Sequence, residues 1–368
     1  MTILFDPIGI NGMTLANRLV RSATWEGMAD GDGRPNSALI DFYRRLAQGG
    51  VGLIITGFAY VRKDGKQLPG KMGFDRDEFG AEYRAMTDAV HNEGGKIAVQ
   101  LVHAGGQVEW QAGRPETVAP SAVEAAQFPQ KPNALTIEAI ADITDRFAAA
   151  ARRAKAWGFD AVQLHGAHGY LINQFLSPLT NRRDDQYGGS DLNRSRFALE
   201  VYHAVRDMVG PDFPVMIKLN AADNIEGGLT LDRALVAAQM LSEAGIDAIE
   251  VSSGTPASKG NSPARIKINR PEKEAYNVEL ARAVQEVVKC PVMAVGGFRS
   301  FEVAEKAVKT GIGCVSMSRP LIREPDLPRR WRSGDLSPAA CISCNGCFKP
   351  GMEGGIYCIA AEKEKYKQ

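Results

Sequence analysis

The chain alternates short apolar segments with longer amphipathic ones through most of its length. Eight segments of four or five residues have the length and composition of buried strands, many of them rich in valine and isoleucine. They lie at residues 18–22, 52–56, 97–101, 161–164, 215–219, 248–251, 292–295 and 314–317. Between them, apolar residues at three- to four-residue spacing predict helices at 37–48, 78–92, 136–157, 193–209, 231–244, 278–288 and 300–309.

Strands that alternate with helices in this way favour a (β/α)8 barrel, the TIM-barrel fold. The alternative is a doubly wound open sheet with a dinucleotide site, which needs a G-x-G-x-x-G turn directly after an early strand. The early glycine cluster at 49–52 leads into its strand instead of following it. We therefore expect one barrel over residues 1–335 and a short cysteine-rich extension at 336–368.

Charge and hydropathy exclude several classes of partner. The 44 basic and 43 acidic residues leave a net charge of +1, so no basic excess indicates binding to nucleic acid or to an anionic membrane. The first residues lack the basic and apolar segments of a secretory signal, and no apolar run has the length of a membrane span. The sequence predicts a cytoplasmic protein that acts on a small molecule.

Two imidazoles and a phenol follow the predicted strand at 161–164. His165, His168 and Tyr170 fall within six positions, among glycines that allow the backbone to turn sharply. A single histidine is usually a core or surface residue, but such a group at the carboxyl end of a barrel strand indicates a catalytic site. It can bind an oxygen and deliver a proton. A zinc hydrolase could instead use both histidines as ligands, but it would need further ligands at neighbouring strand ends, where acids are scarce.

The last two strands predict a phosphate site. Gly296 and Gly297 follow the strand at 292–295, and Ser318 and Arg319 follow the strand at 314–317. Free backbone N–H groups and a guanidinium suit a phosphate, and the loops after strands seven and eight are its usual place in this fold. The other strands supply further candidates at or near their ends: Ala23, Thr24, Trp25, Phe58, Gln100, His103, Lys218, Asn220 and Ser252.

Four of the six cysteines lie near the end of the chain. Cys341, Cys344, Cys347 and Cys358 indicate a metal or cluster site, because a disulfide framework is not expected in a reducing compartment. Four thiolates suit either a 4Fe-4S cluster or structural zinc, and the remaining alternative is that the thiols stay reduced without a metal.

Several motifs occur in order and together resemble those of the Old Yellow Enzyme-type NADH:flavin oxidoreductases. They are L-A-N-R-L-V at 15–20, Q-L-V-H-A-G at 100–105, H-G-A-H-G-Y-L-I-N-Q-F-L-S-P at 165–178 and N-R-R-D-D-Q-Y-G-G-S at 181–190. The resemblance extends from residue 5 to about residue 331.

This resemblance implies an FMN-binding barrel with the flavin at the carboxyl end of the strands. Gln100 would bind the pyrimidine edge of the flavin, and Lys218 would stand near N1 and O2, where most relatives carry arginine. Ala23, Thr24 and Phe58 would lie beside the ring, with Thr24 favoured over Trp25 as the neighbour of N5. Gly296, Gly297, Ser318 and Arg319 would bind the phosphate.

The resemblance also implies the reaction, which is reduction of the activated C=C bond of α,β-unsaturated carbonyl or enoate compounds by hydride transfer from flavin N5. His165 and His168 would bind the substrate oxygen, Trp25 would line the substrate site, and Tyr170 would protonate the α-carbon. NADH or NADPH would supply the electrons, and the residues do not distinguish between them. Relatives assemble as dimers or tetramers, which implies a homo-oligomer.

The cysteine spacing resembles that of 2-enoate reductases, 2,4-dienoyl-CoA reductases and trimethylamine dehydrogenase. This branch of the family implies a 4Fe-4S cluster after the barrel and, for this chain, an external electron carrier. An amine dehydrogenase or demethylase that passes electrons through the cluster is the alternative within the family. The intact set of His165, His168 and Tyr170 favours alkene reduction.

Overall fold

The computed structural model describes residues 2–109 and 116–365. Eight parallel strands close into a barrel in the order β3-β4-β5-β8-β9-β10-β11-β12. Their bounds are β3 (Leu19–Arg21), β4 (Leu53–Tyr60), β5 (Ile97–Val102), β8 (Ala161–Gly166), β9 (Val215–Asn220), β10 (Ala248–Ser252), β11 (Val292–Val295) and β12 (Cys314–Met317). Each strand overlaps a predicted segment, and the (β/α)8 prediction is confirmed.

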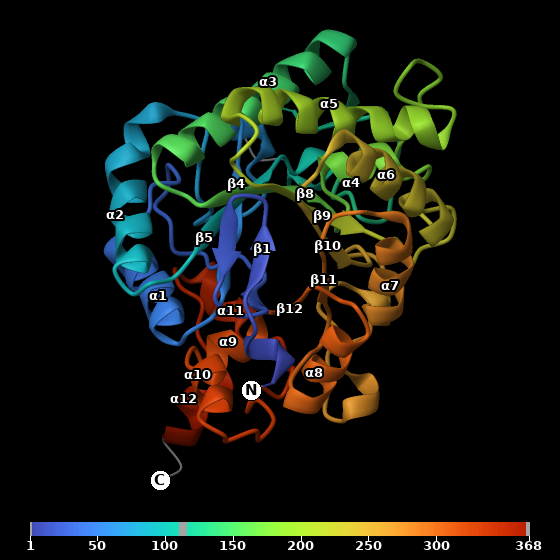
Figure 1. Ribbon diagram of the computed structural model, residues 1–368. Coiled ribbons are helices and arrows are strands. Elements are labelled where there is room, and N and C mark those ends of the chain that lie inside the picture. The colour runs from blue at the N-terminus through green and yellow to red at the C-terminus, as the bar shows by residue number, and fades with distance from the viewer. Residues whose placement is uncertain (1, 110–115, 366–368) are drawn as a thin grey trace.

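Helices surround the barrel, as Figure 1 shows. The seven predicted ones are α1 (Ser37–Gln48), α2 (Gly80–His91), α3 (Ile137–Ala156), α5 (Asp191–Val209), α6 (Leu231–Ala244), α7 (Val278–Val287) and α8 (Phe301–Lys309). Three of them begin after a side chain that accepts a backbone N–H, because Asn36, Thr136 and Ser190 cap α1, α3 and α5. The pattern did not predict α4 (Leu171–Leu176), α9 (Arg319–Arg323) or α10 (Leu327–Arg332).

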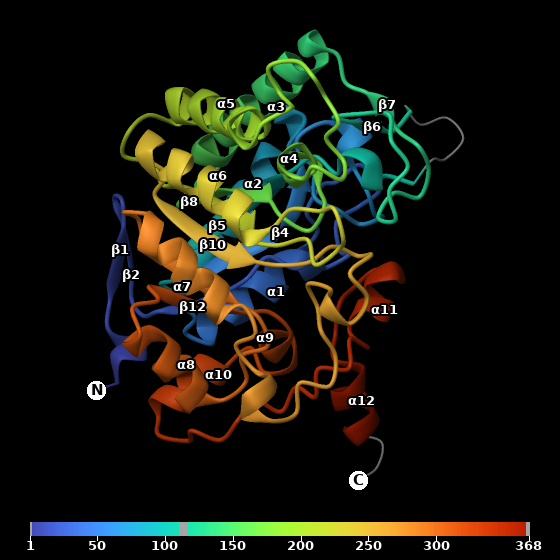
Figure 2. The ribbon, with the colours of Figure 1, turned by 90° about the vertical axis from the view of Figure 1, so that its right-hand side faces the viewer.

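One end of the barrel is closed by an N-terminal hairpin. Strands β1 (Ile8–Ile10) and β2 (Met13–Leu15) pair antiparallel, and their apolar side chains pack on the inward-facing residues of the barrel strands. Figure 2 shows the hairpin at one end of the barrel and α11 (Phe348–Met352) toward the other end. The hairpin therefore leaves the carboxyl ends of the strands as the open end.

The C-terminal segment packs on loops at this open end. The backbone N–H of Ile356 donates to the carbonyl of Glu26, and the Asn345 amide donates to the carbonyl of Ala264 at 2.7 Å. At Gly27, where φ is +70°, a Cβ atom would lie 2.0 Å from the carbonyl oxygen of Gly351. The chain ends with α12 (Ile359–Lys365). No helix within the described residues is both long and apolar enough to cross a membrane.

A buried ion pair fixes the segment that follows β3. The Arg21 guanidinium donates to the Ile55 carbonyl and to Glu26 Oε1, both at 2.7 Å. Glu26 Oε1 also accepts from the Gly57 N–H at 3.0 Å and from the Tyr43 hydroxyl. These bonds tie β3, β4 and α1 together, so the loop between Arg21 and Glu26 has a defined path along the open end.

We expect Glu26→Gln to lower the free energy of unfolding by about 3–5 kcal/mol, because it leaves the Arg21 charge buried without its counter-ion. Urea denaturation measures the change. Glu82→Gln is the matched control, since Glu82 pairs with Arg34 near the surface and the loss should be about 1 kcal/mol or less. Equal small losses in both variants would contradict the role given to the buried pair.

Candidate functional site

A cleft of about 560 Å³ lies at the carboxyl ends of the strands. Most residues expected to bind flavin or substrate line it: Ala23, Thr24, Trp25, Phe58, His168, Tyr170, Lys218, Gly296, Gly297, Ser318 and Arg319. Gln100 and His165 are not among its lining residues; both are buried, and they contact residues that line it or lie below it. Barrel closure thus brings together side chains that are far apart in the sequence.

Four rings form one cluster beside this cleft. The His165 ring centroid lies 4.7 Å from that of Tyr170, 5.2 Å from that of His168 and 5.8 Å from that of Phe58. A tight turn after β8 produces this arrangement, with φ of +60° at His168 and +76° at Gly169. Helix α4 begins immediately after Tyr170, and the phenol ring meets the imidazole of His165 edge-on.

Burial sets the protonation of these rings. It lowers the pKa of His165 and of His168 well below the usual range, and the positive charge of Lys218 lowers both further. Burial raises the pKa of the Tyr170 phenol. Near neutral pH the site therefore holds two neutral imidazoles and a protonated phenol.

Hydrogen bonds indicate which imidazole nitrogens carry a proton. The Ala167 N–H donates to His165 Nδ1 at 3.3 Å, so Nε2 carries the hydrogen of the neutral ring and can donate it. His168 Nε2 lies 2.8 Å from Ser252 Oγ. When the Ser252 hydroxyl donates to Nε2, His168 Nδ1 becomes the second donor.

A hydrogen-bonded layer crosses the barrel interior at the floor of the cleft. Gln100 Nε2 donates to Gln163 Oε1 at 2.7 Å, and Gln163 Nε2 donates to Glu250 Oε2 at 2.9 Å. Lys218 Nζ lies 3.2 Å from the same Glu250 oxygen and donates to Ser22 Oγ at 2.8 Å. All five residues are buried. Burial lowers the pKa of Lys218, and the Glu250 carboxylate opposes this shift.

Some acceptors in this layer have no partner among the described residues. Gln100 Oε1 and Glu250 Oε1 are buried and accept no hydrogen bond from the described part of the chain, and Ser316 Oγ, which belongs to β12 and lines the cleft, has no partner there either. Buried polar atoms are usually satisfied, so unpaired acceptors beside a cleft indicate a site for a ligand or water.

One end of the cleft is suited to an anion. The backbone at Gly296 and Gly297 has positive φ, and a Cβ atom on either would lie 2.9 Å from the Tyr276 ring. Arg319 lines the same end, where its guanidinium donates to the Arg265 carbonyl at 2.8 Å and to Asn345 Oδ1 at 2.6 Å. The glycine backbone and the guanidinium form the type of site expected for a phosphate.

The two residues that compete for the position beside the flavin differ in their contacts. The Thr24 hydroxyl shares a short hydrogen bond with the Ser318 hydroxyl. The Trp25 indole donates to the Pro69 carbonyl at 3.0 Å, and its ring packs on Gly351 of the C-terminal segment. Thr24 is therefore linked to the end of β12, and Trp25 to the loops over the cleft.

Sequence reasoning missed several polar residues of the site. Gln163 and Glu250 lie within strands, so neither appeared in the inventory of strand ends. Gln67 accepts from the Tyr170 hydroxyl at 2.7 Å, and Lys71 lies 3.6 Å from the centroid of the Phe58 ring. Gln67 and Lys71 belong to a polar loop after β4 that carries no recognisable motif. A buried lysine in such a loop has no sequence signal.

The four C-terminal cysteines line one small cavity together with Arg319, Ile322 and Asn345. Backbone N–H groups of Ser343 and Gly346 donate to the sulfurs of Cys341 and Cys344 at 3.5 and 3.4 Å.

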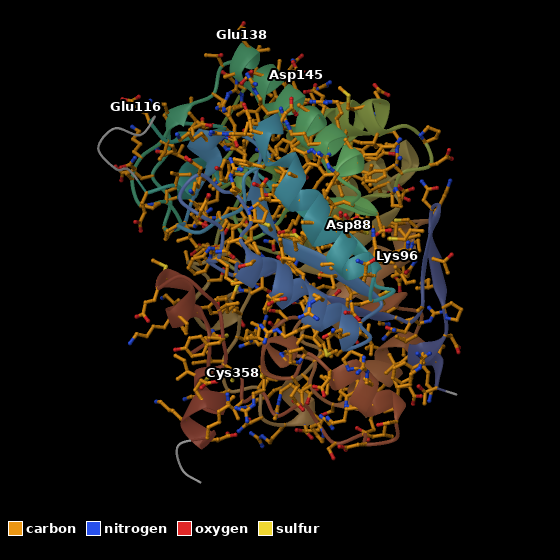
Figure 3. The ribbon with its side chains drawn as sticks, turned by 90° about the vertical axis from the view of Figure 1, so that its left-hand side faces the viewer. Asp88, Lys96, Glu116, Glu138, Asp145 and Cys358 are labelled. Carbon is orange, nitrogen blue, oxygen red and sulfur yellow. The ribbon has the colours of Figure 1, made fainter. Side chains whose placement is uncertain are left out.

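The last thiol of this set also has a charged neighbour. Figure 3 marks Cys358 at the start of the last helix, and Arg323 Nη1 donates to its sulfur at 3.7 Å. Within residues 2–109 and 116–365, no three His, Cys, Asp or Glu side chains are placed to hold one metal ion. His165 and His168 likewise lack the third ligand that a zinc hydrolase would need.

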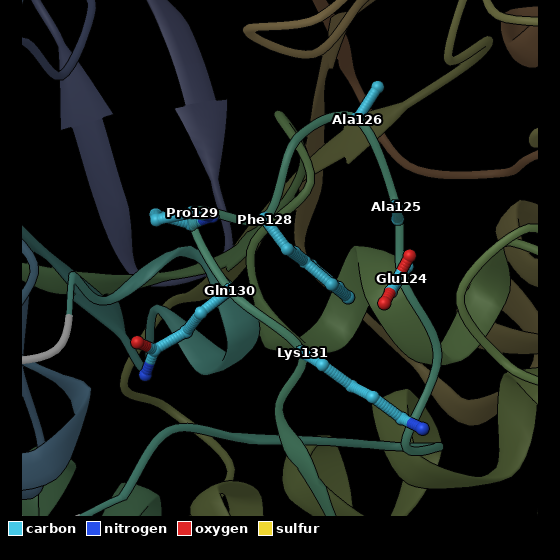
Figure 4. A pocket seen from close by; sticks show the side chains of 7 residues that line it. All are labelled: Glu124, Ala125, Ala126, Phe128, Pro129, Gln130 and Lys131. Atoms are coloured by element: carbon cyan, nitrogen blue, oxygen red, sulfur yellow. The ribbon is translucent and has the colours of Figure 1, made fainter.

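A second hollow of about 490 Å³ is lined by residues of a single loop, as Figure 4 shows. Its lining residues are Glu124, Ala125, Ala126, Phe128, Pro129, Gln130 and Lys131. Its titratable lining residues, Glu124 and Lys131, are both exposed, unlike the buried rings beside the cleft. The cleft at the strand ends is therefore the candidate active site.

Comparison with known proteins identifies the family. The model of the NADH:flavin oxidoreductase / NADH oxidase family matches residues 3–336. The chain is 39% identical over 352 residues to an NADH oxidase of Thermoanaerobacter brockii, which covers 94% of this chain and 53% of that protein. It is 36% identical over 329 residues to an NADPH dehydrogenase of Geobacillus sp., with 89% and 93% covered.

Solved structures give the same result. A 2-naphthoyl-CoA reductase in complex with 2-naphthoyl-CoA matches with a TM-score of 0.88 and 30% identity, covering 96% of this chain and 56% of that one. Histamine dehydrogenase from Rhizobium sp. 4-9 matches with a TM-score of 0.86 and 27% identity, and the match covers 96% of this chain and 51% of that one. The Old Yellow Enzyme homologue from Zymomonas mobilis matches with a TM-score of 0.78 and 30% identity, and the match covers 92% of this chain and 95% of that one.

The chain thus spans about half the length of several of these relatives and nearly the full length of others. The resemblance to Old Yellow Enzyme-type proteins is confirmed over the whole barrel. The chain belongs to the NADH:flavin oxidoreductase / NADH oxidase family, whose members use FMN and NAD(P)H.

Proposed function

We propose that this protein is an FMN-dependent reductase of the activated C=C bond of α,β-unsaturated carbonyl or enoate compounds, with NADH or NADPH as electron donor. The observation that carries the proposal is the ring cluster of His165, His168 and Tyr170. It combines two neutral hydrogen-bond donors with a protonated phenol beside one cleft.

The residues of the cleft fit FMN. Gln100 offers a buried carbonyl oxygen without a partner among the described residues, which suits an N–H group on the pyrimidine edge of the flavin. Lys218 supplies a cation in the same hydrogen-bonded layer. The anion-binding end would hold the phosphate through Gly296, Gly297, Ser318 and Arg319. Ala23, Thr24 and Phe58 would contact the ring, with Thr24 as the neighbour of N5.

When bound, FMN supplies the hydride for the β-carbon of the substrate. His165 and His168 bind the carbonyl or carboxylate oxygen of the substrate and stabilise the negative charge that gathers there. Because both rings are neutral, they donate hydrogen bonds without first gaining a proton. Tyr170 transfers the proton of its hydroxyl to the α-carbon. Trp25 borders the substrate region of the cleft.

Amine oxidation is the competing reaction within the family, because one of the similar solved structures is named histamine dehydrogenase. A cationic amine is bound by aromatic faces that are free to receive it. Here the faces of Phe58 and Tyr170 already lie near the Lys71 amine, at 3.6 and 5.4 Å from the ring centroids. Lys218 adds a second buried basic group. These contacts favour a substrate that gains negative charge.

We also propose that Cys341, Cys344, Cys347 and Cys358 hold a 4Fe-4S cluster in an extension over residues 336–368, beside the barrel at 1–335. The shared cavity and the N–H donors to sulfur support a cluster, since such bonds stabilise cluster thiolates. Arg319 lines both this cavity and the cleft, so the two sites adjoin. The cluster would exchange single electrons with an external carrier.

Tyr170→Phe tests the catalytic assignment. It should slow alkene reduction by about 10²–10⁴-fold, because the proton donor is lost, and leave flavin reduction by NAD(P)H nearly unchanged. Anaerobic stopped-flow absorbance follows the two half-reactions separately. Tyr187→Phe is the control, since its hydroxyl donates to Glu200 away from the cleft. An equal loss in both half-reactions, or no loss, would remove Tyr170 from the acid role.

Metal analysis of anaerobically purified protein tests the cluster. We expect about four iron atoms per chain with matching sulfide, and a clear loss of iron in Cys347→Ser. Cys290→Ser is the control, because Cys290 lies apart from the cavity and should retain full iron content. Zinc at about one atom per chain, without iron, would contradict the cluster assignment.

A further inference from the structure

Lys71 is a buried lysine that has no counter-ion among residues 2–109 and 116–365. It is 1% exposed, although it lies in the polar loop after β4. Its Nζ contacts the Phe58 ring at 3.6 Å from the centroid, and its hydrogen bond to Gln67 Oε1 is long, at 3.4 Å. Among the described residues, no carboxylate forms an ion pair with it; the charged group that acts on it is Lys66.

Such a position is unfavourable for the charged form. Burial lowers the pKa of Lys71 well below its usual range, and the like charge of Lys66 lowers it further. The aromatic faces of Phe58 and Tyr170 offset only part of this effect. The protonated form of such a buried amine becomes strongly stabilised when a neighbouring group acquires negative charge.

Tyr170 is the neighbour that would acquire such a charge. Its hydroxyl donates to Gln67 Oε1 at 2.7 Å, and this is the same oxygen that accepts from Lys71. Burial raises the pKa of Tyr170, so the phenol alone is a weak acid in this environment. A phenolate formed there would need a cation within the same pocket.

Other nearby lysines are already engaged. Lys218 is paired with Glu250 in the floor of the cleft. Lys66 donates to the Gly31 carbonyl at 2.6 Å and lies over the Tyr60 ring. Lys71 is the lysine whose amine shares an acceptor with Tyr170.

We propose that Lys71 is a positioning residue for the proton donor: its ammonium group stabilises the phenolate left on Tyr170 during alkene reduction. The Tyr170 O–H bond breaks, its electron pair stays on oxygen, and the proton forms the new C–H bond at the substrate α-carbon. Water then returns a proton to the phenolate. This inference rests on the proposed function, in which Tyr170 is the acid.

A double-mutant cycle tests the inference. Lys71→Met, Tyr170→Phe and the double variant are loaded with FMN, reduced with NAD(P)H and mixed anaerobically with cyclohex-2-enone, a small unsaturated ketone. Lys71→Met should slow alkene reduction by about tenfold to a hundredfold, as expected when one group that stabilises transition-state charge is lost. It should slow Tyr170→Phe no further, because the phenolate is then absent.

Two readouts separate this role from a structural one. FMN reduction by NAD(P)H should stay normal in Lys71→Met, which shows that the cleft is intact. Lys66→Met removes a neighbouring buried lysine whose charge opposes the ammonium form of Lys71, so it should not slow alkene reduction.

Three results would overturn the inference. If Lys71→Met reduces the alkene at the wild-type rate while Tyr170→Phe reduces it slowly, the role given to Lys71 fails and the acid role of Tyr170 stands. An equal slowing by Lys71→Met with and without the Tyr170 hydroxyl would show that Lys71 acts through packing. If Tyr170→Phe itself reduces the alkene at the normal rate, the acid role of Tyr170 and the role of Lys71 both fail, whereas a wild-type protein that reduces no alkene would contradict the proposed function.

Discussion

The site depends on the buried pair of Lys218 and Glu250. Their contact at 3.2 Å lies inside the barrel, where neither charge would be stable alone. Gln163 and Gln100 extend the contact into a hydrogen-bonded layer, and the apolar cluster capped by the N-terminal hairpin lies on its other side. The layer fixes the lysine at the floor of the cleft and divides a closed apolar core from an open polar site.

The cleft gathers basic side chains that the composition conceals. The net charge of the chain is only +1, yet basic side chains occupy the floor of the cleft, the end proposed to bind phosphate and the loop behind the ring cluster. Lys218, Arg319 and Lys71 hold these three positions. Groups of one sign in a desolvated cleft favour anionic ligands and developing negative charge. The neutral imidazoles add directed hydrogen bonds. The proposed binding of phosphate, binding of the substrate oxygen and delivery of a proton thus all depend on groups that stabilise negative charge.

The sequence predicted what depends on local patterns. β11 and β12 fall at the expected residues, and the cluster of His165, His168 and Tyr170 followed from one motif at a strand end. Short elements escaped prediction, since a six-residue helix such as α4 or a three-residue strand such as β1 is too brief to show a period. Glu250 and Lys71 escaped for another reason: a polar residue is expected at the surface, and only tertiary packing buries it.

The most direct test of the central claim is anaerobic titration of FMN into flavin-free protein, followed by the change in flavin fluorescence. The account predicts saturable binding of one FMN per chain, because the cleft offers one anion-binding end and one cationic floor. Gly296→Val should weaken this binding strongly, since its side chain would meet the Tyr276 ring. A correctly folded protein that takes up no FMN under these conditions would contradict the account.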